Sequence, residues 1–129
     1  MPTPNEPSER QHNMRRVIIE SPYAGDLERN RRYLEWAISD SVRRGEAPFA
    51  SHRMYPGALN DDDPSDRELG IAAGYAWWDA AEAIVFYCDF GMSPGMEAAQ
   101  KIAFEKEKHV EIRFLWQDVT TYARSESST

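Results

Sequence analysis

The chain of 129 residues has the length of a single domain, since domains usually run to about 100–200 residues. Hydrophobic residues make up 41% of it and aromatic residues 12%, which argues against a disordered chain. Acidic residues outnumber basic ones 22 to 15, and the net charge of −7 argues against a protein that binds duplex nucleic acid.

The one cysteine, Cys88, excludes an intramolecular disulfide and a cysteine-rich zinc site. The three histidines lack the spacing of metal ligands, so we expect no bound metal and no cofactor. No apolar run approaches the roughly 18 residues of a transmembrane helix, and the first residues carry no secretory signal. We therefore expect a protein of the cytoplasm, or of the host cytoplasm if a phage encodes it.

The first part of the chain predicts a leader, a strand and a helix. Residues 1–13 contain three prolines and many polar residues, which indicates a flexible leader before a domain at 14–116. The apolar, β-branched run 17–20 is typical of a buried strand, and a turn follows it. The helical period of the apolar residues predicts a helix over 26–44, which Gly45 ends.

The second part predicts three more strands separated by two helices. Ser65 and Glu68 form a capping box, which predicts a helix from 65 to about 78. Ser93 and Pro94 suit the N-cap and first position of a helix over 95–106. The predicted strands cover residues 48–51, 84–88 and 110–115, a loop covers 52–63, and a flexible tail covers 117–129.

This alternation predicts an α/β fold of the flavodoxin-like or Rossmann-like kind. We expect a three-layer sandwich with a mostly parallel central sheet of four to five strands. Ligands of such sheets bind beyond the carboxyl ends of the strands. The loops that matter most are therefore 21–26 and 89–97, followed by the loop that contains His52.

The segment from Asp89 to Glu97 leaves a strand and opens a helix. The helix N-terminus suits an anion or a sugar hydroxyl, and Gly91 and Gly95 let a ligand approach the backbone. Glu97 lies in the first turn, where its carboxylate either acts on a ligand or only complements the helix dipole.

Three further residues, Tyr23, His52 and Glu68, are candidates for ligand binding, and each also has a purely structural interpretation. Tyr23 either contacts a ligand or belongs to a plain turn before an Asp26 cap, and His52 either donates to a ligand or is merely solvated. Glu68 has a capping role of its own. Adjacent Trp77 and Trp78 face different directions on a helix, so we expect one of them in the core. No Walker loop, nucleophile elbow or dinucleotide fingerprint is present, which removes the common kinase, hydrolase and dehydrogenase readings.

Several segments together resemble a small phage and bacterial branch of the nucleoside 2-deoxyribosyltransferase superfamily. Their order and spacing, over about residues 17–115, carry the resemblance. The segments are Ser21–Gly25 with Asn30 downstream, Ala47–His52 followed by Met54 and Tyr55, Arg67–Ile71, and Ser93–Ala99.

The resemblance implies a flavodoxin-like fold and cleavage of the N-glycosidic bond of nucleosides or nucleoside monophosphates. Glu97 matches the nucleophile that attacks the anomeric carbon, and Asp89 matches a catalytic aspartate that contacts the substrate. The resemblance matches Tyr23, Ser93 and, loosely, Glu68 to substrate-contacting positions of the family. The full set of candidate substrate-binding residues is Tyr23, Gly25, His52, Glu68, Ser93, Gly95 and Met96. A carboxylate near the sugar stabilises or captures the positive charge that bond breaking builds there. A second acid, Asp89 or Glu68, would protonate the leaving base.

The chain also departs from the family pattern. Pro94 and Met96 differ from the usual transferase sequence, and residues 117–129 lack the family's C-terminal functional residues.

Three functional hypotheses follow. The first hypothesis is an N-glycosidase or 2-deoxyribosyltransferase. The second is a protein that binds a nucleotide or nucleotide signal without cleaving it, as a phage sponge or sensor. The third is an interaction module with an inactive pocket. The resemblance further implies a homodimer or higher homo-oligomer, with no duplex nucleic acid or membrane as partner.

Overall fold

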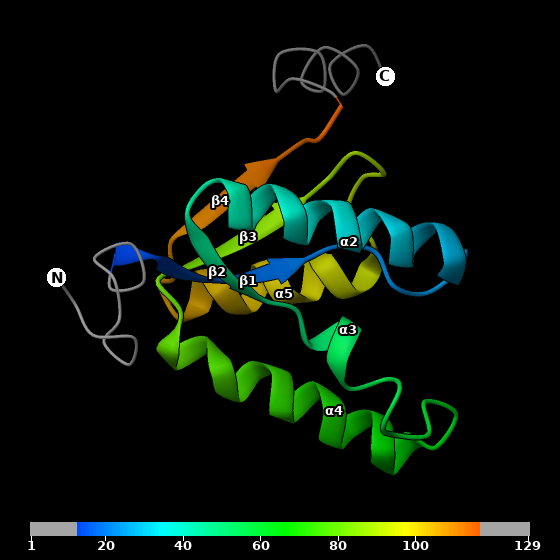
Figure 1. The fold of residues 1–129 in the computed structure, drawn as a ribbon. Coiled ribbons are helices and arrows are strands. Elements are labelled where there is room, and N and C mark those ends of the chain that lie inside the picture. Colours follow the sequence, from blue (N-terminus) through cyan, green and yellow to red (C-terminus); the bar gives the residue numbers. More distant parts are fainter. Residues whose placement is uncertain (1–12, 117–129) are drawn as a thin grey trace, which may run out of the picture.

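The computed structural model describes residues 13–116, which fold into one parallel β-sheet with helices on both faces (Figure 1). Within these residues the sheet has four strands in the order β2-β1-β3-β4. The elements are β1 Arg15–Glu20, α2 Leu27–Arg43, β2 Glu46–Phe49, α3 Ser51–Met54, α4 Pro64–Ala76, the short 3-10 helix η1 Trp77–Ala80, β3 Ala83–Tyr87, α5 Pro94–Glu105 and β4 Val110–Arg113. The predicted flavodoxin-like sandwich is confirmed. Apart from residue 13, the predicted leader and tail lie outside the described residues.

The two faces of the sheet are covered differently. Helix α2 lies on one face, whereas α4, η1 and α5 lie on the other (Figure 1). The chain steps from β1 outward to β2 and then crosses back to β3 on the other side of β1. This reversal between β1 and β3 is the place where sheets of this kind bind ligands. Within residues 13–116 no helix is long and apolar enough to span a membrane.

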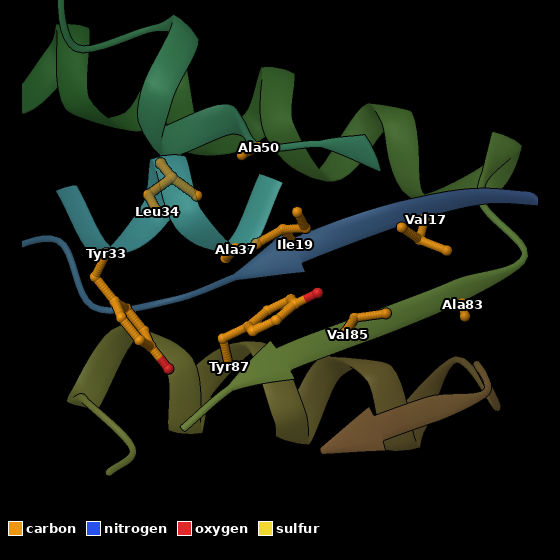
Figure 2. Close-up of a cluster of buried hydrophobic side chains, with 9 residues drawn as sticks. All are labelled: Val17, Ile19, Tyr33, Leu34, Ala37, Ala50, Ala83, Val85 and Tyr87. Carbon is orange, nitrogen blue, oxygen red and sulfur yellow. The ribbon is translucent and has the colours of Figure 1, made fainter. Parts of the chain in front are cut away.

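Alternation along the strands divides the core into two clusters, one on each face. The cluster under α2 is shown in Figure 2 and consists of Val17, Ile19, Tyr33, Leu34, Ala37, Ala50, Ala83, Val85 and Tyr87. The opposite cluster consists of Ile18, Trp78, Ala81, Ile84, Phe86, Cys88, Met96, Ala99 and Ala103. Trp78 is buried and Trp77 is exposed, which confirms the expectation that one of the two lies in the core.

Three of the predicted helix ends are confirmed by their caps. The Asp26 carboxylate accepts from the Arg29 amide ahead of α2, and Gly45 follows the helix with a φ of +89°. The Ser93 hydroxyl accepts from the Met96 amide at 3.2 Å and caps α5.

The predicted capping box of Ser65 and Glu68 is wrong. Helix α4 begins at Pro64, and the Asp63 carboxylate accepts from the Ser65 amide at 2.9 Å. Proline suits the first helical position because its missing N–H would have no partner there, and this moves the cap one residue before the proline. The predicted strand 48–51 is likewise displaced: β2 ends at Phe49, and residue 51 already begins α3.

A buried ionic network ties the start of β2 to the end of β4. The Arg113 guanidinium donates two parallel hydrogen bonds of 2.7 Å to the Glu46 carboxylate, and both side chains are almost fully buried. Arg15 and the Ser41 hydroxyl donate to the same carboxylate at 2.6 and 2.8 Å. Glu111 completes the network by accepting from Arg15 and Arg113 at 2.8 Å each. Every charge in this cluster is therefore paired.

Candidate functional site

The candidate site lies where the strands end, around the reversal between β1 and β3. Because all four strands are parallel, their carboxyl ends share one edge of the sheet. The segments after them bring residues 21–26, 50–52, 88–93 and 114–116 to that edge.

The segment after β1 is held in place by Asn30, a buried residue of α2. Its side-chain amide donates to the carbonyl oxygens of Tyr23 and Ala24, both at 3.1 Å. Gly25 has a φ of +98°, which only glycine adopts without strain, so it turns the chain into α2. Burial, together with the Asp61 carboxylate, raises the pKa of the Tyr23 phenol. Tyr23 therefore reaches from the β1 segment towards the loop before α4.

His52 is joined directly to this segment. Its Nε2 lies 2.7 Å from Oγ of the buried Ser21, so one hydrogen bond links the end of β1 to α3. Burial lowers the pKa of His52 to about 4, and the ring is therefore neutral at physiological pH. Two adjacent strand ends thus share a neutral hydroxyl–imidazole pair.

Asp89, which follows β3 closely, is turned towards the α2 side of the sheet. Its Oδ1 accepts from the Tyr33 hydroxyl at 2.6 Å and from the Leu115 amide at 2.7 Å, and its Oδ2 accepts from the Trp116 amide at 2.9 Å. Three donors therefore engage the carboxylate that the sequence analysis proposed as catalytic. The structure gives Asp89 an anchoring task, holding the segment after β4 against α2.

The remaining predicted residues of this region lie in the first turn of α5, in different surroundings. Glu97 is exposed, and its side chain has no hydrogen bond or ion pair with any described residue. Gly95 is also exposed, and a Cβ there would meet only Ser93 Oγ, at 4.0 Å. Met96 is 1% exposed and packs inside the core cluster, so in this conformation it is not open to a ligand.

Glu68 is exposed on α4. The structure therefore brings Tyr23, Gly25 and His52 together at the ends of β1 and β2. Ser93, Gly95 and Glu97 stand at the start of α5, and Asp89 faces the other side of the sheet. Within residues 13–116 no three histidine, cysteine or acidic side chains gather as a metal site.

Sequence reasoning missed Glu20, the last residue of β1. Burial raises the pKa of its carboxyl to about 8, and Tyr75 of α4 interacts with it electrostatically. The sequence feature that could have identified it is an acidic residue at the end of the otherwise apolar run Val17–Glu20.

A separate hollow of about 370 Å³ lies on the α2 side of the same edge. Aromatic rings dominate it: Trp116 lies 5.5 Å from Tyr33, 5.4 Å from Trp36 and 5.8 Å from Phe90, measured between ring centroids. The Arg29 guanidinium stacks over Phe90 at 4.1 Å. The charged residues Asp26, Glu28, Arg29 and Arg32 complete the lining of this hollow.

The chain matches the family model of a domain of unknown function, DUF7768, over residues 15–114. That range takes in all four strands and the helices between them, so the chain belongs to this family. No curated protein matches the chain.

Proposed function

We propose that this member of the DUF7768 family binds a nucleoside or nucleoside monophosphate between the ends of β1 and β3 and breaks or transfers its N-glycosidic bond. The observation that carries the proposal is the sheet order β2-β1-β3-β4, which makes this edge the ligand-binding position of the fold. The resemblance of the motifs there to nucleoside 2-deoxyribosyltransferases supplies the reaction class. In this reaction Glu97, exposed on the first turn of α5, attacks the anomeric carbon.

The chemistry requires a ligand with a sugar and favours one with a phosphate. At the start of α5 Pro94 has no N–H, and Ser93 accepts from the amides of Met96 and Glu97, which leaves the Gly95 amide open. This amide and the Ser93 hydroxyl suit a phosphate or a sugar hydroxyl. The Tyr23 ring and the neutral His52 lie at the adjoining strand ends, where they suit contacts with the base. Water as the second substrate gives hydrolysis, and a second base gives transfer.

The test is release of free base, measured by chromatography after incubation with ribonucleosides, deoxyribonucleosides and their 5′-monophosphates. We expect one class to be cleaved and Glu97→Gln to lose at least about 100-fold in turnover, because a covalent nucleophile has no substitute. Glu105→Gln, an exposed acid in the last turn of the same helix, serves as the matched control. Equal turnover by wild type and Glu97→Gln would reject Glu97 as the nucleophile.

Binding without cleavage is the second candidate. It is favoured by the engagement of Asp89, which removes one of the two carboxylates that the resemblance supplies to catalysis. In that case a nucleotide raises the melting temperature by mass action and is recovered intact. Recovery of free base from the same mixture excludes this alternative.

A further inference from the structure

Glu20 is a carboxyl group placed at the ligand-binding edge with no stabilising partner. It ends β1 beside Phe86 of β3, on the face that also carries Ile18, α4 and α5. It is only partly exposed, and its side chain forms no hydrogen bond or ion pair with any described residue. Within the described residues no fully buried side-chain polar atom lacks a partner, so the Glu20 oxygens retain access to solvent.

The surroundings of Glu20 keep the carboxyl in its neutral form. Burial raises its pKa to about 8, and no neighbouring positive charge offsets the loss of hydration. The titratable groups around it whose pKa is shifted by burial are Tyr75 on α4, His52 on α3 and Cys88 just after β3. His52 is neutral at physiological pH, because burial lowers its pKa to about 4. The cations on these helices, Arg53, Arg67 and Lys101, are exposed, and burial alone accounts for the raised pKa of Glu20. The buried residues of α5 are Met96, Ala99 and Ala103, none of which titrates.

The other candidate acids are less suited to this task. The Asp89 carboxylate accepts hydrogen bonds from Tyr33, Leu115 and Trp116 on the α2 side, so it is directed away from the face that carries α5. Glu68 is exposed to solvent on α4. A partly buried carboxyl in apolar surroundings is the arrangement by which proteins keep a general acid protonated near neutral pH.

We propose that Glu20 is the general acid that protonates the leaving base, an inference that rests on the function proposed above. As the bond between C1′ and the base breaks, its electron pair moves to the base, which takes the proton of the Glu20 carboxyl. The Glu97 carboxylate forms a bond to C1′ at the same time. Water then attacks C1′, gives a proton to the Glu20 carboxylate and frees Glu97. In transfer, the incoming base takes the place of water.

The experiment compares two leaving groups in wild type and Glu20→Gln. One substrate is the nucleoside cleaved by wild type, and the other is the p-nitrophenyl glycoside of the same sugar, whose leaving group needs no proton. We expect Glu20→Gln to lower kcat/KM for the nucleoside by about 100-fold or more and to leave kcat/KM for the p-nitrophenyl glycoside nearly unchanged, because kcat/KM reports the steps up to loss of the leaving group and not the later attack of water. We also expect wild-type activity to fall as pH rises through about 8, a limb that the residual activity of the variant lacks.

The controls separate the ways in which the proposal can fail. Glu82→Gln alters an exposed acid before β3, at the opposite end of the strand, and its amide oxygen can still accept from the Arg16 amide. Thermal unfolding of each variant confirms that it is folded. Equal loss on both substrates, or no loss on either, overturns the role of Glu20 while the proposed function stands. A wild type that releases no base from any nucleoside overturns both.

Discussion

At the scale of single residues, burial works in opposite directions on two neighbouring groups. Glu20 and His52 both lie at the carboxyl edge, and burial disfavours the charged form of each. The glutamate therefore keeps its proton to about pH 8, whereas the histidine loses its proton at about pH 4. The edge thus has an acidic hydroxyl and a neutral imidazole at neutral pH, both able to bind an uncharged base.

His52 by itself lowers the stability of the folded protein in mild acid. Its pKa is about 4 when folded and 6.5 in the unfolded chain, so its contribution is constant above pH 6.5 and is lost as the pH falls towards 4. The loss reaches up to roughly 3 kcal/mol at about 1.4 kcal/mol per pKa unit.

We expect urea unfolding to show this loss as a difference between wild type and His52→Gln, which keeps a donor for Ser21. From pH 7 to pH 5 the variant should gain about 2 kcal/mol relative to wild type, in which the opposite contribution of Glu20 offsets that of His52. His109→Gln alters an exposed histidine and should behave as wild type. An equal change in wild type and His52→Gln would contradict the assignment.

At the scale of elements, the ionic network joins strands from opposite edges of the sheet. Glu46 begins β2 and Arg113 ends β4, and the Tyr87 hydroxyl links Arg113 at 3.1 Å to Asp40 of α2 at 2.8 Å. Burial opposes ionisation of Glu46, but hydrogen bonds from Arg113, Arg15 and Ser41 outweigh it and lower its pKa to about 2. The network therefore fixes how α2 and β4 sit on the sheet.

Removing one partner of this network is expected to be costly. Arg113→Met leaves the Glu46 charge buried with fewer partners and should reduce the free energy of unfolding by about 3–5 kcal/mol. The exposed pair between Arg44 and Asp40 gives a control, since Arg44→Met should cost less than about 1 kcal/mol.

A double-mutant cycle measures the coupling in the network. The double variant Glu46→Met, Arg113→Met should lose much less stability than the sum of the single losses, because no uncompensated charge remains. Additive losses in chemical unfolding would show that the two side chains are not coupled.

Local chemistry made the elements predictable, and tertiary contacts set the rest. Asp26, Gly45 and Ser93 act within a few residues of themselves, so the sequence located the helix ends that they form. Arg113 and Glu46 lie 67 residues apart, and no local pattern pairs them. The same holds for the candidate site. The order of the elements predicted which loops form it, but the burial of Glu20 and the orientation of Asp89 depend on contacts with residues that are distant in the sequence.

At the scale of the whole molecule, the buried groups combine into one stability profile against pH. The Glu20 carboxyl has a pKa of about 8 when folded and 4.5 when unfolded, so its contribution is full below pH 4.5 and is lost as the pH rises through 8. His52 contributes the opposite slope between about pH 6.5 and 4. The hydrogen bond from Arg15 is the chief cause that lowers the pKa of Glu111 to about 2, and Glu46 has a similar value. Both acids therefore lose stabilisation below about pH 4.5.

These slopes place the greatest stability of the protein on the acidic side of neutral. From pH 8 to 6.5 only Glu20 changes, and the free energy of unfolding should rise by roughly 2 kcal/mol. Between 6.5 and 4.5 the slopes of Glu20 and His52 cancel, which gives a plateau, and below 4.5 the network acids and His52 reduce stability together.

Glu20→Gln should remove the rise and be more stable than wild type at pH 8. Urea unfolding from pH 4 to 9 tests this, and a wild-type maximum near pH 8 would contradict it. Burial of the Glu20 carboxyl lowers the stability of the fold and gives it no structural benefit. If Glu20→Gln stabilises the protein and also abolishes base release, the glutamate is retained for its role in the reaction.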